Sequence, residues 1–555
     1  MRTKDQLLEF DFSEKKSFRK HFLVGIRNIF LILFLLLMVS YQQPNPVQNN
    51  TRMAKLIHAQ LNRTFNPQDS TPPQTIDHQI KKLLETFYQI RNFNPAWIEN
   101  YNTTDQFNIF YNFLDSAKYY GFPLDYFNFK EIKEIRQKIH SPEKEQNHTD
   151  LISLELSSTF SALKALIYLN QGISASDQGL NQSFLEGLPY LLNEAVDQKN
   201  LKLKLQEVQP SIVQYHKIKH SMSFFIDMNL SIKYTTPSFI DDKTLAKSLY
   251  YAGVIECPEF NSIHKKSDAL YKLQDRYNLP HCSTLDRSTQ EKLVMLLEQR
   301  YYQACLNLHR LRKLNHSGEN YLFVNIPEFK LQVIESNEIK QVFNVIVGKK
   351  HTPTPSFSSS LEKVVANPYW TVPKSIVNQE MVSRIRKDST YLVRNGYFII
   401  NNKEERVPDS IIDWSKPDPL GNQYWIRQTH GLSNALGQVK FLFPNEHRVY
   451  LHDTPGKSLF KKANRTYSHG CIRLEHPDQL AQYLLDQNFS QNTIDIQTII
   501  RANKHHVIEL PQKIDIHIQY ITCSAGNHSE LEFLNDIYNL DQKEINQIFP
   551  AQTEI

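Results

Sequence analysis

The chain carries little net charge for its length. Its formal charge is +5 over 555 residues, and it shows neither a basic stripe nor zinc-finger spacing, so nothing indicates that it binds nucleic acid. Hydrophobic residues make up 40% and charged residues 22% of the chain, a balance that excludes a mainly disordered protein. The length is sufficient for several domains.

Glycine is scarce, and its distribution is uneven. Only 15 glycines occur in the chain. Glycine marks backbone that turns tightly or closely approaches another group, so a concentration of glycines predicts a loop-built site in the last third of the chain. The concentrated glycines are Gly348, Gly396, Gly421, Gly431, Gly437, Gly456 and Gly470.

A long apolar run occurs near the N-terminus. The run "IFLILFLLLMV", Ile29–Val39, follows several basic residues, and residues 22–41 have about the length that a membrane helix needs. Basic residues before such a run keep the N-terminus in the cytoplasm. We expect a cytoplasmic tail at 1–21, a signal-anchor helix at 22–41 and a polar linker at 42–78. No small-x-small cleavage site follows the run, although a cleaved signal peptide is the alternative.

The cysteine count is odd, which leaves at least one thiol free unless it pairs between chains. An exported chain lies where disulfides persist, so two of Cys257, Cys282 and Cys305 are candidates for a bond. Sequence leaves the connectivity among these three and Cys523 open.

The first half of the exported part has helical periodicity. Apolar residues recur at i, i+3 and i+4, which predicts a helical scaffold domain over 79–245. Residues 246–315 resemble the three-helix peptidoglycan-binding-like module, with Ser288 expected as a helix N-cap and Glu291 completing a capping box. This module either binds the cell wall or acts as a spacer.

From residue 320 the pattern changes to short strands separated by turns. It predicts a mainly-β catalytic domain, a sandwich or barrel, over 320–500. A helical and loop-rich insertion at about 374–424 is expected to form a capping lid, and 501–555 a further strand and helix. The fold class is therefore α+β and multidomain.

Two motifs in the β-rich part carry chemistry: "VYLHDTPG" with His452 and "SHGCIR" with Cys471. A thiolate is the reactive form of cysteine, and it needs a base or a positive environment. His452 ends a strand pattern and is the candidate base. The backbone N–H groups of His469, Gly470 and Cys471 are candidates for an oxyanion hole.

Two other interpretations of this cysteine stay open on residue types alone. Cys471 could be an inert core residue, or it could join His452, His469 and His476 as a zinc ligand. The H-x-C-x₄-H spacing matches no usual zinc-finger pair, so we expect no metal.

The sequence around both motifs resembles the L,D-transpeptidases. "HDTPGKSLFKKANRTYSHGCIRLEHP" resembles the family signature, a histidine, a spacer and then (S/T)-H-G-C-φ-(R/N). "VNIPEFKLQVIE", "NPYWTVPKSI" and "NALGQVKFLFPNEHRVYLHDTP" resemble the large, scaffold-bearing Gram-negative subgroup. The resemblance extends from about Leu83 to the C-terminal helix.

This resemblance implies roles for individual residues. Cys471 would be the acyl-forming nucleophile and His452 its base, with the oxyanion held by the backbone at His469, Gly470 and Cys471. His430 departs from the subgroup, which usually has proline there. The residues implied in substrate binding or in shaping the pocket are Arg473, Ser468, Tyr450, Trp425 and Asn434.

The resemblance also implies a reaction. Tetrapeptide stems of peptidoglycan would acylate Cys471, and transfer to a diaminopimelate amine would form 3→3 cross-links, with no cofactor and with carbapenems as inhibitors. The expected location is the inner membrane with the catalytic part in the periplasm, or the periplasm alone if the signal is cleaved. The expected partners are stem peptides, the membrane and cell-wall synthases. The alternatives are hydrolysis, attachment of a protein to the wall by the same acyl-enzyme, and a non-catalytic wall scaffold.

Overall fold

The computed structural model describes most of the chain after residue 45. The predicted cytoplasmic tail and signal-anchor helix lie outside the described residues. The described ranges are 46–64, 76–140, 148–173, 180–261, 265–314, 318–489, 494–526 and 530–550.

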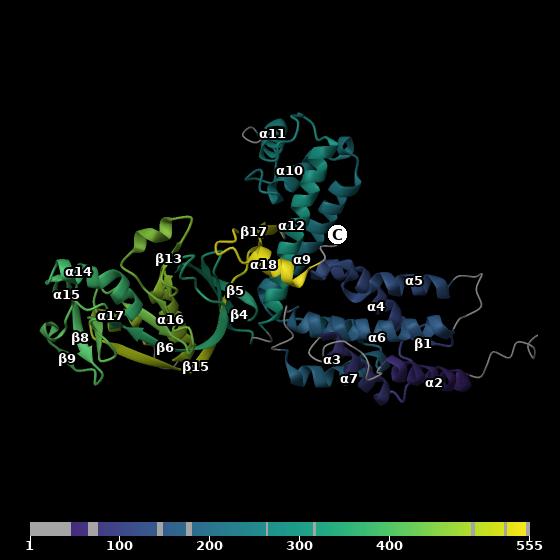
Figure 1. Ribbon diagram of the computed structural model, residues 1–555, viewed down its shortest axis with the longest axis horizontal. Coiled ribbons are helices and arrows are strands. Elements are labelled where there is room, and N and C mark those ends of the chain that lie inside the picture. The colour runs from purple at the N-terminus through teal and green to yellow at the C-terminus, as the bar shows by residue number, and fades with distance from the viewer. Residues whose placement is uncertain are drawn as a thin grey trace, which may run out of the picture.

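Helices build the first half, on one side of the molecule in Figure 1. Helix α6 (His148–Gln171) lies at the centre, and most of its residues are buried. It is the one helix in the described part long and apolar enough to cross a membrane, but 72% of its apolar window is buried by protein, as expected of a core helix. Around it lie α2 (Pro46–Thr64), α3 (Ile76–Ile90), β1 (Ile98–Glu99), β2 (Asn102–Thr103), α4 (Asp105–Asp115), η1 (Ala117–Tyr120), η2 (Leu124–Phe127), α5 (Phe129–Ile139), α7 (Gln182–Asp197), α8 (Leu201–Glu207) and α9 (Val213–Tyr234).

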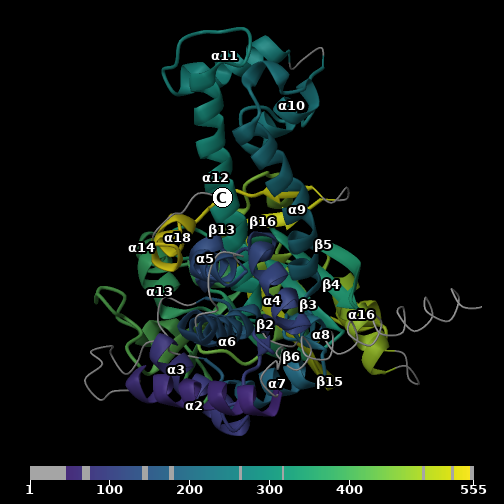
Figure 2. The same cartoon turned by 90° about the vertical axis from the view of Figure 1, so that its right-hand side faces the viewer.

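A small helical module projects from this region on the ends of two long helices (Figure 2). It consists of η3 (Pro237–Phe239), α10 (Asp242–Tyr251), α11 (Lys266–Arg276) and the first half of α12 (Arg287–Arg312). The N-cap of α12 is Asp286, whose carboxylate accepts from the Thr289 N–H. The predicted Ser288 cap is therefore wrong by two residues, because the helix already begins at Arg287 and Ser288 lies in its first turn.

Helix α12 belongs to both the module and the scaffold. Leu293 and Leu297 in its first half are fully buried, as are Leu270 and Leu273 of α11. At about 1.5 Å per residue the helix extends for about 39 Å, and its C-terminal half lies buried beside α9 and α6. The two helical units therefore share a rigid element.

The β-rich part is a closed barrel. Its strands hydrogen-bond in the order β13-β5-β14-β12-β11-β6-β15-β3-β4, and β4 also pairs with β5, which closes the sheet. Helices α16 (Pro477–Asn488) and α17 (Ile496–Arg501) pack against it. The strands are β3 (Tyr321–Asn325), β4 (Lys330–Glu335), β5 (Glu338–Gly348), β6 (Phe357–Ala366), β11 (Val439–Leu442), β12 (Leu451–His452), β13 (Thr466–Ser468), β14 (Ile472–Leu474) and β15 (His506–Gln519).

The barrel sheet continues beyond residue 500, where the catalytic domain was expected to end. Strand β15 pairs with β6 on one side and β3 on the other, so it lies inside the sheet. After it come β16 (Cys523–Ala525), β17 (Leu531–Phe533) and α18 (Asp541–Ile548), which lie against the helical region. The last part of the chain therefore joins the barrel to the helices.

Strand β3 is buried on both faces, so its sequence shows no alternation of apolar and polar residues. Leu322 and Val324 point into the barrel core, whereas Tyr321 and Phe323 pack in the helical core. Because alternate residues of a strand face opposite sides, one strand contributes to both cores.

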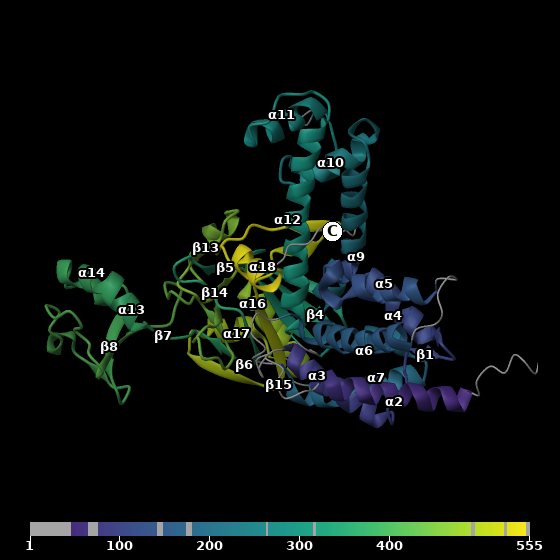
Figure 3. The ribbon, with the colours of Figure 1, turned by 45° about the vertical axis from the view of Figure 1, so that its right-hand side comes forward.

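The insertion forms a small unit that extends from the barrel on the side away from the helical region (Figure 3). Its four-stranded sheet has the order β7-β10-β8-β9, and buried apolar residues such as Val377, Ile399 and Ile426 give it a core of its own. The unit is wider than the predicted 374–424, because both bordering strands belong to it. Its elements are β7 (Trp370–Thr371), α13 (Lys374–Ile376), the π-helix η4 (Val377–Met381), α14 (Val382–Lys387), α15 (Tyr391–Arg394), β8 (Tyr397–Asn401), β9 (Arg406–Val407), η5 (Asp409–Ile411) and β10 (Tyr424–Gln428).

Candidate active site

Adjacent strands of the barrel bring the two sequence motifs together. Strands β12 and β14 are parallel neighbours, with His452 opposite Arg473. On its other side β12 pairs with β11, where Lys440 is opposite His452. Residues opposite one another on neighbouring strands share a face, so these three side chains form one row.

Alternation decides what lies on that face. Leu451 and Ile472 pair with each other and are fully buried in the barrel core. Their chain neighbours Tyr450, His452 and Cys471 therefore point to the opposite face. The thiol, the imidazole and two cations are thus gathered outside the barrel core by period-two geometry.

His452 is held as a neutral base. Its Nδ1 lies 2.5 Å from the Asp453 carbonyl oxygen, and a carbonyl only accepts, so Nδ1 carries the hydrogen and Nε2 is left unprotonated. Burial, with a further contribution from the Arg473 cation, lowers the pKa of His452 to about 3. The ring is neutral at physiological pH and can accept a proton at Nε2.

Cys471 rests as a thiol. Burial raises its pKa, and hydrogen bonding from Tyr450 together with the charges of Lys440 and Arg473 opposes that effect. Its Sγ donates to the Arg448 carbonyl at 3.9 Å, and within the described residues it forms no hydrogen bond to His452. The nucleophile therefore needs a base at the moment of attack.

The loop before Cys471 only partly matches the predicted oxyanion hole. The Gly470 N–H donates to the Ser468 hydroxyl at 3.1 Å, so it is already engaged, and Ser468 shapes the loop. In the part of the chain that the structure describes, the His469 and Cys471 N–H groups donate to no acceptor. The predicted set of three donors therefore reduces to two.

Gly470 gives this loop its shape. Its φ of +114° lies in a region that other residues rarely adopt. Gly348 in the adjacent strand is required for another reason, because a Cβ there would lie 2.1 Å from the Thr352 carbonyl oxygen. The predicted concentration of glycines around the site is thus explained at these two positions.

Arg473 and Tyr450 border the thiol. The Arg473 Nε is buried and has no hydrogen-bond partner within the described residues, so a donor on a cation is left unused beside the nucleophile. Burial lowers the pKa of the Arg473 guanidinium and raises that of the Tyr450 phenol. The Tyr450 ring lies 5.6 Å from that of His452 and packs under Lys440 Nζ at 3.9 Å.

Trp425 and Asn434 lie on segments outside the row of strands β11, β12 and β14. Trp425 belongs to β10 of the insertion, under the Lys374 ammonium. Asn434 is fully buried, where its amide donates to the Thr429 carbonyl and accepts from the Leu436 N–H. The predicted substrate contact of Asn434 is therefore wrong, because both ends of its side chain bind its own loop.

Two residues that sequence analysis did not select also lie at the site. Lys440 is one, and its signal was a lysine within the apolar strand pattern "QVKFLF". The other is Glu380 of the insertion, whose carboxylate lies 2.7 Å from His469 Nε2. No local signal marks Glu380, since 89 residues separate it from its partner. His430, the departure from the subgroup, packs against Tyr369.

The remaining cysteines form no disulfide. Cys257, Cys282, Cys305 and Cys523 are all free, so the suggested bond among the first three is wrong in this structure. Among the described residues, no three His, Cys, Asp or Glu side chains form a group that could hold a metal ion.

Two protein families match parts of this chain. Residues 319–496 match the L,D-transpeptidase catalytic domain and residues 82–222 the Scaffold domain. A Haemophilus influenzae protein named "Putative L,D-transpeptidase" is 34% identical over 240 residues, which are 43% of this chain and 48% of that protein, so the match spans about half of the relative's length. A solved L,D-transpeptidase from Mycobacterium smegmatis aligns over 37% of this chain and 60% of its own at 16% identity, with a TM-score of 0.17. The part of this chain that matches the L,D-transpeptidase catalytic domain is thus preceded by a part that matches the Scaffold domain.

Proposed function

We propose that the chain is a peptidoglycan L,D-transpeptidase that forms 3→3 cross-links in cell-wall biogenesis. The observation that carries this proposal is the row on β11, β12 and β14. There a thiol, a neutral imidazole and two cations share one face. This combination suits acyl transfer through a thioester.

In the first step the Cys471 sulfur attacks the carbonyl between diaminopimelate and the terminal D-Ala of a tetrapeptide stem. His452 Nε2 accepts the thiol proton as the S–C bond forms. The N–H groups of His469 and Cys471 hold the oxyanion. The C–N bond then breaks, and D-Ala leaves with a proton returned by His452.

In the second step the side-chain amine of a second diaminopimelate attacks the thioester. The amine loses a proton to His452, the C–S bond breaks, and the sulfur regains its proton. The unused Nε donor of Arg473 is suited to a stem carboxylate, since guanidinium groups bind carboxylates with charge-assisted hydrogen bonds. Carbapenems would acylate the same sulfur.

We place the catalytic part in the periplasm, attached to the inner membrane by the N-terminal apolar run. This location brings Cys471 to nascent wall and to cell-wall synthases as partners. The projecting module fits a role in contacting the wall.

The test is intact-protein mass spectrometry of the full-length chain. Wild type and Cys471→Ala would be incubated with a carbapenem and, separately, with disaccharide-tetrapeptide. We expect a drug adduct on wild type alone and a cross-linked dimer from the tetrapeptide.

The other outcomes each have a meaning. An adduct with only tripeptide product would make the enzyme an L,D-carboxypeptidase. A drug adduct without either the dimer or the tripeptide would favour the remaining acyl-enzyme alternative, attachment of a protein to the wall. No adduct on folded wild type would overturn the nucleophile and favour a non-catalytic wall scaffold.

A further inference from the structure

Tyr538 reaches the active-site region from the far end of the chain. It lies outside the residues 319–496 that match the catalytic family. Its buried hydroxyl donates to the Gly348 carbonyl at 2.8 Å and accepts from the Thr354 N–H at 3.2 Å. Burial raises the pKa of the phenol, so the hydroxyl stays neutral and keeps its proton to donate.

Thr354 connects Tyr538 to the nucleophile loop. Its buried hydroxyl donates to the Gly470 carbonyl at 2.8 Å and accepts from the Gly348 N–H at 2.9 Å. The Gly470 carbonyl and the Cys471 N–H belong to the same planar peptide unit. A hydrogen bond that holds this carbonyl therefore also sets the direction of the Cys471 N–H, one of the two free oxyanion donors.

The other end of the connection is helix α12. The Tyr520 hydroxyl accepts from the Tyr538 N–H at 2.8 Å and donates to Asp536 at 2.6 Å. Asp536 accepts from the backbone N–H of Asp541 at 2.9 Å. The Asp541 carboxylate pairs with Arg310 of α12 at 2.8 Å, and both side chains are 9% exposed.

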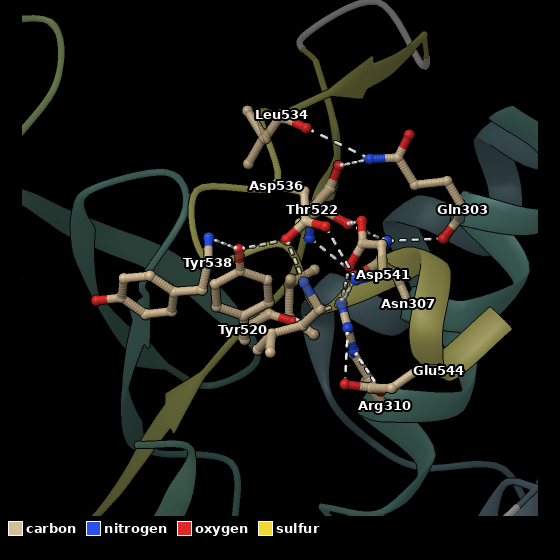
Figure 4. Close-up of polar contacts among 12 residues, drawn as sticks. Gln303, Asn307, Arg310, Tyr520, Thr522, Leu534, Asp536, Tyr538, Asp541 and Glu544 are labelled. Carbon is tan, nitrogen blue, oxygen red and sulfur yellow. Dashed lines mark hydrogen bonds and ion pairs between the residues drawn. The ribbon is translucent and has the colours of Figure 1, made fainter. Parts of the chain in front are cut away.

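Figure 4 shows the polar contacts between α12 and the C-terminal segment that carries Thr522, Asp536 and Asp541. Several amide and hydroxyl groups from the two elements face one another, so the attachment does not depend on the ion pair alone. The Asn307 amide of α12 donates to the Thr522 hydroxyl at 2.9 Å, and that hydroxyl donates to Asp541 at 2.6 Å. The residues that bridge α12 and this segment are Gln303, Asn307, Arg310, Thr522, Leu534, Asp541 and Glu544.

We propose that Thr354 and Tyr538 are positioning residues that aim the Cys471 N–H at the oxyanion, and that Tyr520, Asp536 and Asp541 anchor them to α12. We call this chain of contacts the C-terminal tie. Because α12 also carries the projecting module, the tie joins the module's helix to the nucleophile loop. This inference rests on the proposed acylation of Cys471.

The first test compares two variants of Thr354. Thr354→Ser keeps the hydroxyl, whereas Thr354→Val keeps the shape and removes the donor. At saturating carbapenem we expect Thr354→Val to lower the acylation rate constant at least tenfold, which is less than the roughly 10²–10³-fold loss when an oxyanion-hole donor is removed, because the Cys471 N–H itself remains. We expect Thr354→Ser to stay within twofold of wild type.

Alkylation of Cys471 by iodoacetamide separates positioning from general damage, because it forms no oxyanion. We expect the alkylation rate of Thr354→Val to match wild type. An equal loss of acylation and alkylation would overturn the proposal, as would wild-type acylation in Thr354→Val. Wild type that is alkylated but never acylated would instead refute the proposed function.

Tyr538→Phe is a second variant for the case in which Thr354→Val does not fold. It keeps the ring that stacks on Tyr520 at 5.3 Å and removes only the hydroxyl. We expect an acylation loss of about three- to tenfold, consistent with one hydrogen bond. The matched control is Tyr321→Phe, which removes a buried hydroxyl bonded to Gln214 and the Val213 N–H and should leave acylation unchanged.

Asp541→Asn tests the attachment to α12. The variant loses the charge that pairs with Arg310, and we expect acylation to fall two- to fivefold with alkylation unchanged. Wild-type acylation in a folded Asp541→Asn would overturn the part of the proposal that extends to α12.

Discussion

Burial disfavours the charged form of Glu155 in the scaffold and of His452 in the barrel. In the scaffold, burial raises the pKa of Glu155 to about 7. In the barrel, burial lowers the pKa of His452 to about 3. Desolvation penalises the charged form in both, so the carboxyl gains a proton and the imidazole loses one.

Glu155 and His452 differ in whether an atom of the side chain is left without a hydrogen-bond partner. Glu155 accepts from the N–H groups of Ala96 and Trp97 and from the Tyr88 hydroxyl, so both of its oxygens serve the fold. His452 uses only Nδ1 and keeps Nε2 available. A buried polar group with every partner internal is structural, whereas one with an unused atom beside a thiol is suited to catalysis.

The largest effect should come from removing that unused atom. His452→Asn can still donate to the Asp453 carbonyl, but it has no basic nitrogen. We expect acylation by a carbapenem to fall about 10³-fold, the usual range for a general base, and the free energy of unfolding to change by less than about 1 kcal/mol. Rapid-quench mass spectrometry and urea denaturation measure the two. A rate within tenfold of wild type would contradict the assignment of His452 as the base.

The scaffold should show the opposite pattern. Glu155→Ala leaves the buried N–H groups of Ala96 and Trp97 without an acceptor, and we expect it to destabilise the helical region by about 3 kcal/mol. Acylation per folded molecule should be unchanged. Urea denaturation followed by circular dichroism at 222 nm measures the stability, with the exposed Glu131→Ala as control. A large loss of acylation in folded Glu155→Ala would remove the distinction between the two sites.

The pH dependence of stability sharpens the same contrast. The folded-state pKa of Glu155 lies above its ordinary value of 4.5, so its contribution is full below pH 4.5 and is lost as pH rises towards 7. We expect wild type to lose about 2 kcal/mol relative to Glu155→Gln between pH 5 and pH 7. If the free energy of unfolding changes equally in the two proteins between pH 5 and pH 7, the raised pKa of Glu155 is contradicted.

The smallest effect concerns the insertion. Glu380 and His469 form a pair whose side chains are 41% and 34% exposed, and solvent screening limits such pairs to below about 1 kcal/mol. Glu380→Gln should therefore slow acylation no more than about fivefold, and less at high salt. Glu404→Gln, which removes the exposed pair with Arg427 on the same unit, is the control and should have no effect. A loss above tenfold would mean that the insertion does more than pack on the loop.

Local patterns predicted the parts of the fold that depend on residue type and period. The helical first half, the strands after residue 320 and the insertion follow from them. Cys471 and His452 were selected as candidates by their motifs together with the family resemblance. Asn434 was misassigned because a buried asparagine that closes its own loop has the same local sequence as one that faces a substrate. Glu380, Thr354 and Tyr538 could not be selected, since their partners lie 89 or more residues away.

The sequence by itself determined which atoms can react, because the chemistry of a thiol and an imidazole belongs to the residue. It also determined which side chains share a strand face, because strands alternate with a period of two. Only the tertiary structure decided the protonation of His452, the engagement of the Gly470 N–H by Ser468 and the aim of the Cys471 N–H. These depend on burial and on hydrogen-bond partners, and partners such as Thr354 come from distant parts of the chain.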